Sequence, residues 1–365
     1  MHEGRITDDT RLRASLPTLQ RLRAAGAHIV LASHLGRPKG RVDPALSLEP
    51  VADVLGELLG TPVAFASDCV GDVAQSAIAM LGDGDVLLLE NLRFHPGETK
   101  NDPAFARALA ELADIYVNDA FGTAHRAHAS TAGMLANIAA AAAGELLQKE
   151  LRHLGVVLEP ERPLLCLLGG AKVSDKLGVL LALAQHADVL CVGGAMAYTF
   201  LAAQGQPTGA SLLEESRLDD ARRILAAAEQ RDCRLLLPTD HVVALQIEAG
   251  AKTRVVSTIP DGWIGVDIGP ESAQAFAAEA IKARTILWNG PMGIFEIDAF
   301  AAGTERVAHA VAESAAVSVV GGGDSLAAVH KLGIGDRIGH LSTGGGASLE
   351  YVQGLELPGV AALEQ

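Results

Sequence analysis

The sequence predicts an α/β protein of two domains, each built on an open, mainly parallel sheet. Short apolar runs alternate with helical patterns along the whole chain, which is the rhythm of doubly wound sheets. Hydrophobic residues make up 49% of the chain and the mean hydropathy is positive, which suits strands that are buried on both faces. At 365 residues, the chain is long enough for two separate cores.

The apolar runs that we interpret as strands are Ile29–Ala32, Val63–Phe65, Val86–Leu89, Ile115–Val117, Leu164–Leu168, Val189–Val192, Leu235–Leu237, Ile286–Trp288 and Val317–Val320. The helices expected between them include Leu16–Ala25, Leu48–Leu59, Pro103–Leu112, Lys176–Ala187 and Ala299–Ser314. The run Thr7-Asp8-Asp9-Thr10 consists of helix-capping residues and predicts a helix that begins at Arg11. No strand precedes this helix in the sequence, so we expect the first sheet to be short of one member.

The domain boundary is predicted near residues 145–160. Glu145–Leu154 has an amphipathic helical pattern, and Glu159–Pro163 interrupts the chain before the next strand. We therefore expect an N-terminal domain at residues 1–144, a connector helix at 145–160, a C-terminal domain at 161–340, and a hinge and tail at 341–365.

Charge and composition exclude several classes of protein. The formal net charge is −15, which argues against a nucleic-acid partner. Met1–Arg5 lacks the apolar core of a signal peptide, and the longest apolar stretch, around 138–143, is too short to span a membrane. The four cysteines, Cys69, Cys166, Cys191 and Cys233, form no CxxC pair, so we expect buried thiols in a reducing cytoplasm and no zinc framework.

Glycine-rich turns recur through the second half of the sequence. They are Gly169-Gly170-Ala171-Lys172, Gly193-Gly194, Trp288-Asn289-Gly290-Pro291, Gly321-Gly322-Gly323-Asp324-Ser325 and Gly344-Gly345-Gly346. All but the last directly follow a predicted strand. A strand, a glycine turn and a helix together present free backbone N–H groups and the positive end of a helix dipole. Several such units around one sheet predict a cradle for a polyphosphate.

Charged side chains in these turns suggest nucleotide chemistry. Lys172 and Lys176 are placed to meet terminal phosphates, although solvated lysines on a tight turn are an alternative interpretation. Asp324 is a candidate Mg²⁺ ligand, and Ser325 either caps a helix or binds phosphate. Glu296 could bind ribose hydroxyls, but the loop that carries it could equally be a purely structural one.

The first half carries isolated Arg and His residues just after strands. His34 and Arg37 follow one predicted strand, Arg93 follows another, and Arg126 follows a third. If these strands share one parallel sheet, the three arginines converge and can bind a phosphate ester by bidentate hydrogen bonds. Arg11 could join them. Surface ion pairs for each arginine, and structural hydrogen bonds for the histidine, remain as alternatives.

Several catalytic motifs are absent from the sequence: it has no GxSxG, no HExxH, and no Cys or His spacing that is typical of a metal site. No covalent nucleophile stands out. Phosphoryl transfer needs mainly positioning of the reactants and neutralisation of charge, so it is compatible with a sequence that lacks these motifs.

From about Gly4 to its end, the chain resembles the bacterial form of the phosphoglycerate kinase family. The matching stretches are TDDTRLRASLPT, SHLGRPKG, LLLENLRF, VNDAFGTAHRAHAS, LGGAKVSDK, WNGPMGIFE, GGGDS and HLSTGGGASLE. The resemblance implies two Rossmann-like three-layer α/β/α domains, joined by a helix and hinge, in a monomer. The N-terminal domain would bind 3-phosphoglycerate or 1,3-bisphosphoglycerate, and the C-terminal domain would bind ADP or ATP with Mg²⁺.

The resemblance also implies roles for individual residues. Those near the substrate would be Arg11, His34, Leu35, Gly36, Arg37, Arg93 and Arg126, and the catalytic ones Arg11, Lys172 and Gly345. The nucleotide contacts would be Gly170, Ala171, Lys172, Lys176, Gly194, Asn289, Pro291, Glu296, Gly322, Gly323, Asp324 and Ser325, with Asp324 also on the metal.

One departure from the family pattern concerns the start of the chain. The family has a strand that ends in an Arg-x-Asp-x-Asn-x-Pro motif before the first helix, and this sequence begins after it. If the molecule starts at Met1, we therefore expect low activity and a loosened N-terminal domain. The other explanation is a misplaced start codon or a trimmed sequence. A truncated relative that binds nucleotide without turnover is one alternative, and a nicotinamide-dependent oxidoreductase is a weaker one, since no strand-linked GxGxxG is evident.

Overall fold

The computed structural model describes residues 6–364, which form two compact units. Unit 1 comprises Met1–Leu151 and Glu356–Gln365, and unit 2 comprises Arg152–Leu355. Met1–Arg5, where we predict no apolar core of a signal peptide, lies outside the described residues. Helix α6 (Glu145–Leu158) runs from unit 1 into unit 2 and is longer than the sequence pattern indicated.

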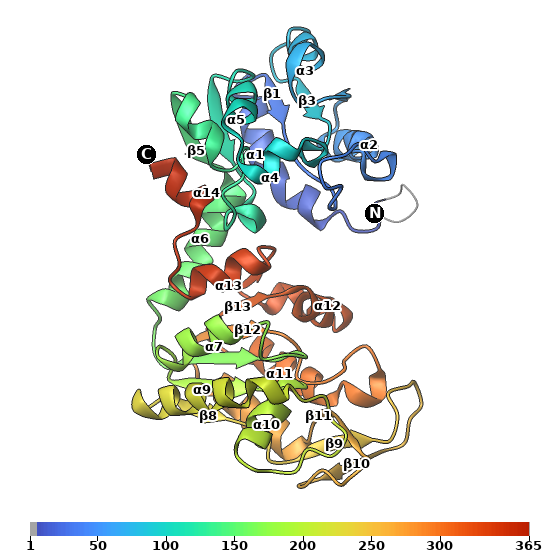
Figure 1. Cartoon of the computed structure of the whole chain (residues 1–365), viewed down its shortest axis with the longest axis vertical. Helices are drawn as coiled ribbons and strands as arrows, with labels where there is room; N and C mark the ends of the chain where they lie inside the picture. Colours follow the sequence, from blue (N-terminus) through green and yellow to red (C-terminus); the bar gives the residue numbers. More distant parts are fainter. Residues whose placement is uncertain (1–5, 365) are drawn as a thin grey trace. The chain divides into compact units, whose positions relative to one another are not determined.

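Unit 1 contains two small parallel sheets flanked by helices (Figure 1). Its strands are β1 (Ile29–Leu31), β2 (Val63–Ala66), β3 (Val86–Leu89), β4 (Ile115–Asn118) and β5 (Ala140–Ala143). Its helices are α1 (Thr10–Ala24), α2 (Glu49–Leu59), α3 (Gly71–Ile78), α4 (Pro96–Lys100), α5 (Pro103–Ala110) and α14 (Pro358–Ala361). Short 3-10 helices lie at η1 (Pro44–Leu46), η2 (Leu92–Phe94), η3 (Phe121–Thr123), η4 (Gly133–Asn137) and η8 (Ala362–Glu364).

The sheet order in unit 1 corrects one expectation. Strands β1, β3 and β2 form one parallel sheet, whereas β4 pairs in parallel with β5. The strand before Arg126 therefore does not belong to the ladder that carries the strands before Arg37 and Arg93. Strand β5 was not predicted, because a run of alanines has low strand propensity.

The start of the first helix also differs from expectation. Helix α1 begins at Thr10, and its N-cap residue Asp9 makes no side-chain capping hydrogen bond. Asp9 instead pairs with Arg13 at 2.8 Å, and the carboxylate of Asp8 accepts a hydrogen bond from the Thr10 N–H at 2.9 Å.

Unit 2 is built on a six-stranded parallel sheet in the order β14-β13-β12-β6-β7-β8. These strands are β6 (Leu164–Leu168), β7 (Val189–Val192), β8 (Arg234–Leu236), β12 (Thr285–Asn289), β13 (Val317–Gly321) and β14 (His340–Ser342). An antiparallel sheet, which the sequence did not predict, joins β9 (His241–Ala244), β10 (Thr253–Val256) and β11 (Ile264–Ile268).

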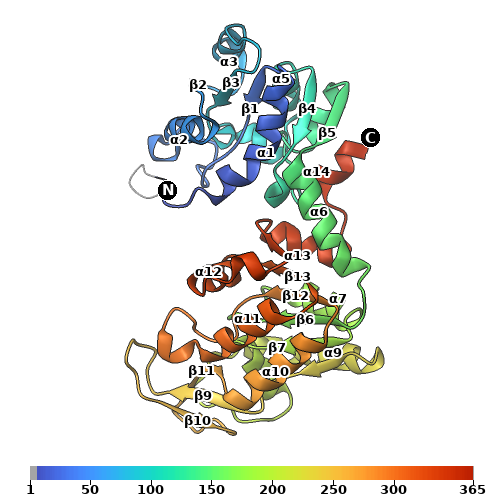
Figure 2. The same ribbon diagram turned by 180° about the vertical axis from the view of Figure 1, so that it is seen from behind.

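Helices cover both faces of the six-stranded sheet. They are α7 (Leu177–Ala184), α8 (Met196–Ala203), α9 (Leu218–Gln230), α10 (Pro270–Lys282), α11 (Ala302–Glu313), α12 (Gly323–Lys331) and α13 (Gly346–Val352), with 3-10 helices η5 (Glu215–Arg217), η6 (Asp298–Phe300) and η7 (Gly335–Arg337). Helices α7 and α9 lie on one face, and α10 and α11 pack together on the other (Figures 1 and 2).

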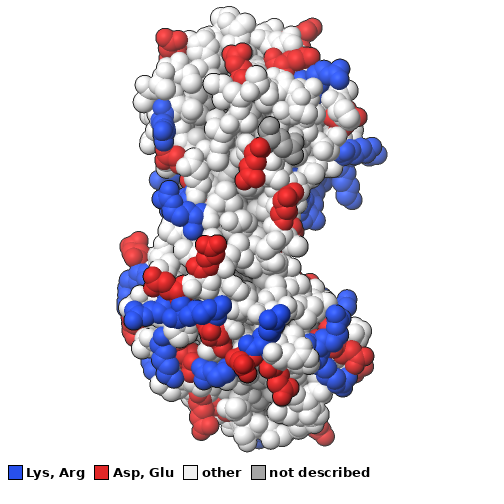
Figure 3. Space-filling model, turned by 90° about the vertical axis from the view of Figure 1, so that its left-hand side faces the viewer, with Lys and Arg blue, Asp and Glu red and all other residues white. Residues whose placement is uncertain are grey.

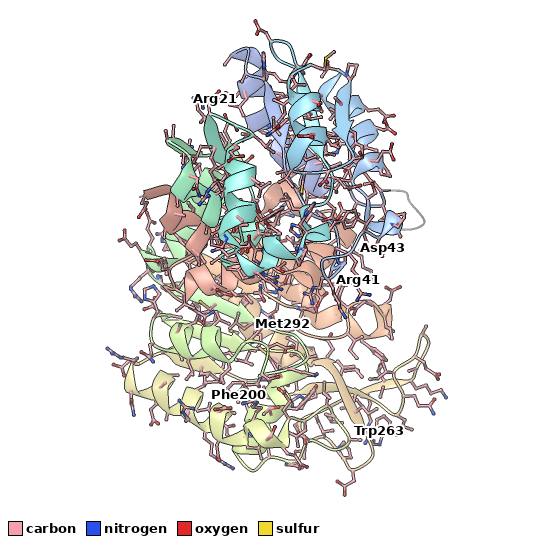
Figure 4. All side chains as sticks on the ribbon, turned by 45° about the horizontal axis from the view of Figure 1, so that its top comes forward. Arg21, Arg41, Asp43, Phe200, Trp263 and Met292 are labelled. Carbon is pink, nitrogen blue, oxygen red and sulfur yellow. The ribbon has the colours of Figure 1, made fainter. Side chains whose placement is uncertain are left out.

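Burial explains why the continuous apolar runs became central strands. Every residue of β6, β7 and β12 is buried. Trp288 of β12, Phe200 of α8 and Met292, the last two labelled in Figure 4, are fully buried in unit 2. A strand covered by helices on both faces has no polar face, so its sequence does not alternate.

The end of the chain returns to unit 1. The Gly359 N–H donates to the Ala124 carbonyl at 2.8 Å, and the Asn118 side chain donates to the Gly359 carbonyl at 3.0 Å. A Cβ at Gly359 would lie 3.0 Å from the Ala124 Cα, so this close approach favours glycine. The preceding residues 341–355 belong to unit 2.

Surface and helix properties agree with the composition. On the face in Figure 3, basic and acidic side chains are interspersed rather than gathered by sign. Among residues 6–364, no helix combines the length and the apolar character needed to cross a membrane. All four cysteines are buried, as predicted.

Candidate active site

Asn91 organises the loops that follow β1 and β3 in unit 1. It is fully buried, and its side-chain amide donates to the carbonyls of Leu35 and Leu46 at 2.8 and 2.9 Å. Its side-chain oxygen accepts a hydrogen bond from the Arg93 N–H at 3.1 Å. Asn91 therefore ties the loop of His34 to η2. Sequence reasoning missed this role, although a polar residue just after a buried strand was a usable signal.

Arg93 is the most buried of the predicted phosphate-binding arginines, with 9% of its surface exposed. Its Nη1 donates to the Gly36 carbonyl at 2.9 Å, and its buried Nε has no hydrogen-bond partner among the described residues. Burial lowers the pKa of Arg93, and the charges of Arg126 and Arg37 lower it further, while Glu98 opposes them. The structure thus brings three arginines together even though they follow strands of two sheets.

The His34 side chain lies close to these arginines. Burial lowers its pKa to about 4, and the charges of Arg93, His128 and Arg11 act in the same direction. His34 is therefore neutral at physiological pH, when its ring can both donate and accept hydrogen bonds. The influence of Arg11 on His34 places the start of α1 next to this site.

Leu35 and Gly36 serve the site through their backbone. Their carbonyls accept hydrogen bonds from Asn91 and Arg93. Gly36 has a φ of 63°, and a Cβ there would lie 2.8 Å from a methyl carbon of Leu46. Glycine is needed at this position for the loop to pass so close to η1.

A buried carboxylate, which sequence reasoning also missed, lies beside the arginines. Glu98 accepts hydrogen bonds from the Ser130 N–H at 3.0 Å and hydroxyl at 2.6 Å, and it lies 3.6 Å from His128 Nδ1. Burial opposes its ionisation, but the hydrogen bonds from His128 and Ser130 outweigh burial and lower the pKa of Glu98. The carboxylate fixes the loop of residues 125–130 against α4.

The glycine turns of unit 2 differ from the predicted cradle. The N–H groups of Gly169, Gly170, Gly193 and Gly194 donate to the carbonyls of Asn289, Pro291, Leu168 and Met292, so all four are already used by the backbone. A Cβ at Gly169 would lie 1.9 Å from the Pro291 oxygen. These glycines allow the turns to pack together, and they do not offer free donors to a phosphate.

Lys176 joins two of these turns. Its Nζ donates to the carbonyls of Gly169 and Asn289 at 2.6 and 2.7 Å. Burial lowers the pKa of Lys176 to about 8, against the opposing charges of Asp324 and Asp175. The coupling to Asp324 places the ammonium group close to the start of α12.

At the N-terminus of α12, another predicted phosphate cradle, neighbouring turns of the described residues do not use the backbone donors. Its N-cap Gly322 has a φ of 93°, and Gly323 and Asp324 are exposed. The first N–H groups of a helix have no partner within the helix and favour anions. Asp324 adds an exposed carboxylate, the type of oxygen ligand that Mg²⁺ prefers, so the residues present fit this cation.

Two other predicted ligands have structural partners instead. Ser325 is fully buried, and its hydroxyl oxygen accepts a hydrogen bond from the Gly290 N–H at 2.5 Å. The Asn289 amide, also buried, donates to the Gly321 carbonyl at 2.9 Å. Both side chains hold the turns after β12 and β13 in place, and their predicted nucleotide contacts stay a prediction.

The remaining predicted residues of unit 2 lie on turns around the same sheet. Ala171, Lys172 and Glu296 are exposed, and Gly194 has a φ of 66°. Lys172 helps to lower the pKa of Glu214, although hydrogen bonds from Ser174 are the larger favourable cause and burial opposes them.

The C-terminal glycine turn supplies a helix cap. Gly345 is the N-cap of α13 with a φ of 55°, and it makes no side-chain capping bond because it has no side chain. The hydroxyl of Ser342 instead lies 2.7 Å from that of Ser348.

Comparison with known proteins identifies the family. The family model described as phosphoglycerate kinase matches residues 1–355. The chain belongs to the phosphoglycerate kinase family. It is therefore a phosphotransferase, a kinase of glycolysis. Phosphoglycerate kinases of Moorella thermoacetica and Rubrobacter xylanophilus are 55% and 58% identical to it. The matched regions cover 100% and 99% of this chain, and 93% and 92% of the two relatives.

Solved structures agree with this assignment. The phosphoglycerate kinase of Coxiella burnetii has a TM-score of 0.91 at 42% identity, and that of Pyrococcus horikoshii OT3 has 0.85 at 34%. Each comparison covers 100% of this chain and 93% of the other. These matches confirm the predicted α/β fold and phosphoglycerate kinase function. None of these matches supports the truncated, non-catalytic relative or the oxidoreductase.

Proposed function

We propose that unit 1 binds 3-phosphoglycerate or 1,3-bisphosphoglycerate and that unit 2 binds ADP or ATP with Mg²⁺. The observation that carries this proposal is the buried Arg93, whose Nε has no hydrogen-bond partner and which Arg37 and Arg126 adjoin. Concentrating cations in this way is unfavourable unless an anion neutralises them. A phosphate ester matches both the charge and the planar donor geometry of guanidinium groups.

The donors of unit 2 suit a nucleotide. Free N–H groups at the start of α12, with Lys176 beside them, would meet the phosphates, and Glu296 would take the ribose. Asp324 would hold Mg²⁺, which supplies positive charge at the phosphate oxygens. Gly170, Ala171, Gly194 and Pro291 would shape the pocket through their backbones.

The chemistry requires little proton transfer. In the direction from ATP, the attacking group is a carboxylate that is already ionised at neutral pH, so no general base is needed. Arg11 and Lys172 would neutralise charge on the transferring phosphoryl group, and Gly345 would place backbone close to it. Holding the two substrates on different units would limit hydrolysis until both are bound.

The proposal is tested by measuring ATP formation from ADP and 1,3-bisphosphoglycerate with Mg²⁺, together with Mg-ADP binding on the same sample. Turnover that requires both substrates and Mg²⁺ is expected. Nucleotide binding without turnover would contradict the catalytic assignment.

We also propose a cytoplasmic monomer, for which size-exclusion chromatography with light scattering should give a mass near 37.7 kDa.

A further inference from the structure

A group of three potential metal ligands lies in unit 1, and none of its members belongs to the proposed arginine site. Among residues 6–364, Asp68, Cys69 and His95 place a carboxylate oxygen, the Sγ and a ring nitrogen within 4.8 Å of one another. Asp68 and Cys69 follow β2, and His95 follows η2 after β3. Because β2 and β3 are paired parallel strands, these loops emerge at the same edge of the sheet.

We propose that Asp68, Cys69 and His95 form a binding site for Zn²⁺. A thiolate, an imidazole and a carboxylate are the ligand types that this ion takes, and a thiolate disfavours Mg²⁺ and Ca²⁺. Three protein ligands leave one of four tetrahedral positions for water. The site differs in position and in donor chemistry from the Mg²⁺ site expected at Asp324, and it does not depend on the proposed substrate sites.

The geometry is largely organised for binding. His95 Nε2 lies 2.7 Å from Asp68 Oδ1, and the same oxygen accepts a hydrogen bond from the Cys69 N–H at 2.7 Å. The His95 ring stacks on Phe105 with a centroid separation of 5.1 Å, which orients the imidazole. Cys69 is buried, whereas the side chains of Asp68 and His95 are 41% and 33% exposed, so the group borders solvent on the side of these two residues.

The charges around the sulfur also favour a cation. Burial raises the pKa of Cys69 to about 12, and the charges of Asp68, Glu98 and Glu90 contribute in the same direction. Burial by itself does not favour an ion, but the carboxylates of Asp68, Glu98 and Glu90 add negative charge that would stabilise a divalent cation in place of the thiol proton. Since binding displaces that proton, affinity should rise with pH.

Sequence spacing could not reveal this site. Asp68 and Cys69 lie far from His95 along the chain, so no motif of closely spaced ligands exists. The proposed site therefore departs from the sequence-based expectation that Cys69 is a buried free thiol with no role in binding zinc.

Titration with Co²⁺ tests the site, because this ion substitutes for Zn²⁺ and absorbs when bound to thiolate. The sample is the full-length, untagged, reduced and metal-free chain. We expect a near-ultraviolet thiolate-to-cobalt band that saturates at one ion per chain and disappears when Zn²⁺ is added. Cys69→Ser should abolish the band, and Asp68→Asn and His95→Gln should each weaken binding about 10-fold or more.

Matched controls separate this site from other ligands. Cys233→Ser removes another buried thiol, and His28→Gln removes a histidine that also lies beside an aspartate, Asp83, at 3.4 Å. Both variants should bind Co²⁺ as the wild type does. No band in the wild type, or a band that survives Cys69→Ser, would overturn the proposal. If Cys69→Ser does not fold, as judged by circular dichroism, unchanged affinity in both Asp68→Asn and His95→Gln would overturn it.

Discussion

Arg93 illustrates how one side chain can hold a loop and still keep a donor for a ligand. One end of its guanidinium is bound to the Gly36 carbonyl, and its buried Nε has no partner among the described residues. A lysine at this position would keep the charge but lose the planar set of donors. Charge alone therefore does not explain why arginine is present.

We predict that Arg93→Lys raises the KM for 3-phosphoglycerate about 10-fold, or about 1.4 kcal/mol, with a small effect on the KM for ATP. Steady-state kinetics in the ATP-consuming direction measures both values. Arg107→Lys, an exposed change on α5, is the matched control and should leave both unchanged. An unchanged KM for 3-phosphoglycerate in Arg93→Lys would contradict its proposed role.

A second prediction concerns His34 and acid stability. Its pKa falls from 6.5 to about 4 on folding, so between these values the unfolded chain binds a proton that the folded chain does not. The free energy of unfolding should therefore fall as the pH decreases from about 6.5 to about 4, by at most about 3 kcal/mol from this group. His34→Gln should flatten this part of the profile.

Urea denaturation at a series of pH values measures the effect of His34. His28→Gln, at an exposed histidine, controls for the removal of an imidazole. Equal slopes in the wild type and His34→Gln would show that His34 does not contribute to the pH dependence.

At the scale of elements, glycines allow the turns at one end of the large sheet to pack without side chains between them. Gly169 and Gly170 donate to the turn after β12, and Gly194 donates to the same segment. Lys176 links the first and second of these turns through two carbonyls. These hydrogen bonds therefore join the turns into one unit close to the start of α12.

Gly169→Ala should disrupt this packing. The added Cβ would lie 1.9 Å from the Pro291 oxygen. Because this oxygen is a backbone atom, the clash can be relieved only if one of the two turns shifts. We expect a loss of about 3 kcal/mol in the free energy of unfolding and weaker Mg-ADP binding. Thermal denaturation and calorimetric titration measure these effects.

Gly335→Ala is the matched control in the same unit, because its Cβ would meet neighbours only at ordinary distances of 3.6 Å or more. It should leave stability within about 0.5 kcal/mol of the wild type. A tolerated Gly169→Ala would mean that the turns are less tightly interlocked than the hydrogen bonds indicate.

At the scale of the whole molecule, we propose that the two units carry different anion sites on a body of net charge −15. The acidic charge is spread among basic residues rather than concentrated, as Figure 3 shows for one face. Unit 1 gathers guanidinium groups, whereas unit 2 offers backbone donors, one partly buried lysine and a carboxylate.

Amide hydrogen exchange should therefore respond to each ligand in a different unit. Mg-ADP alone should slow exchange at the start of α12 and in residues 169–176, because ligand binding opposes local opening. 3-Phosphoglycerate alone should slow exchange in residues 33–37 and 91–95. Protection of the Arg93 segment by Mg-ADP without protection of α12 would contradict the proposed division of substrates.

The sequence by itself determined the fold class, the central strands and the family. Strands buried on both faces, such as β6 and β12, are continuous apolar runs, and this one-dimensional signal survives without any knowledge of contacts. The arginines and glycines were visible because they follow such strands. Strand β5 and the antiparallel sheet of unit 2 were not predicted, since β5 consists of alanines and the strands of that sheet are short and of mixed composition.

Only the tertiary structure decided which polar groups are already occupied. The glycine N–H groups after β6 and β7 looked free in the sequence, yet neighbouring turns use them. Arg126 reaches the site from a different sheet, and Glu98 and Asn91 hold the loops in place. Hydrogen bonds and charge interactions depend on distances between segments that are far apart in the chain, so no local pattern of residue types encodes them.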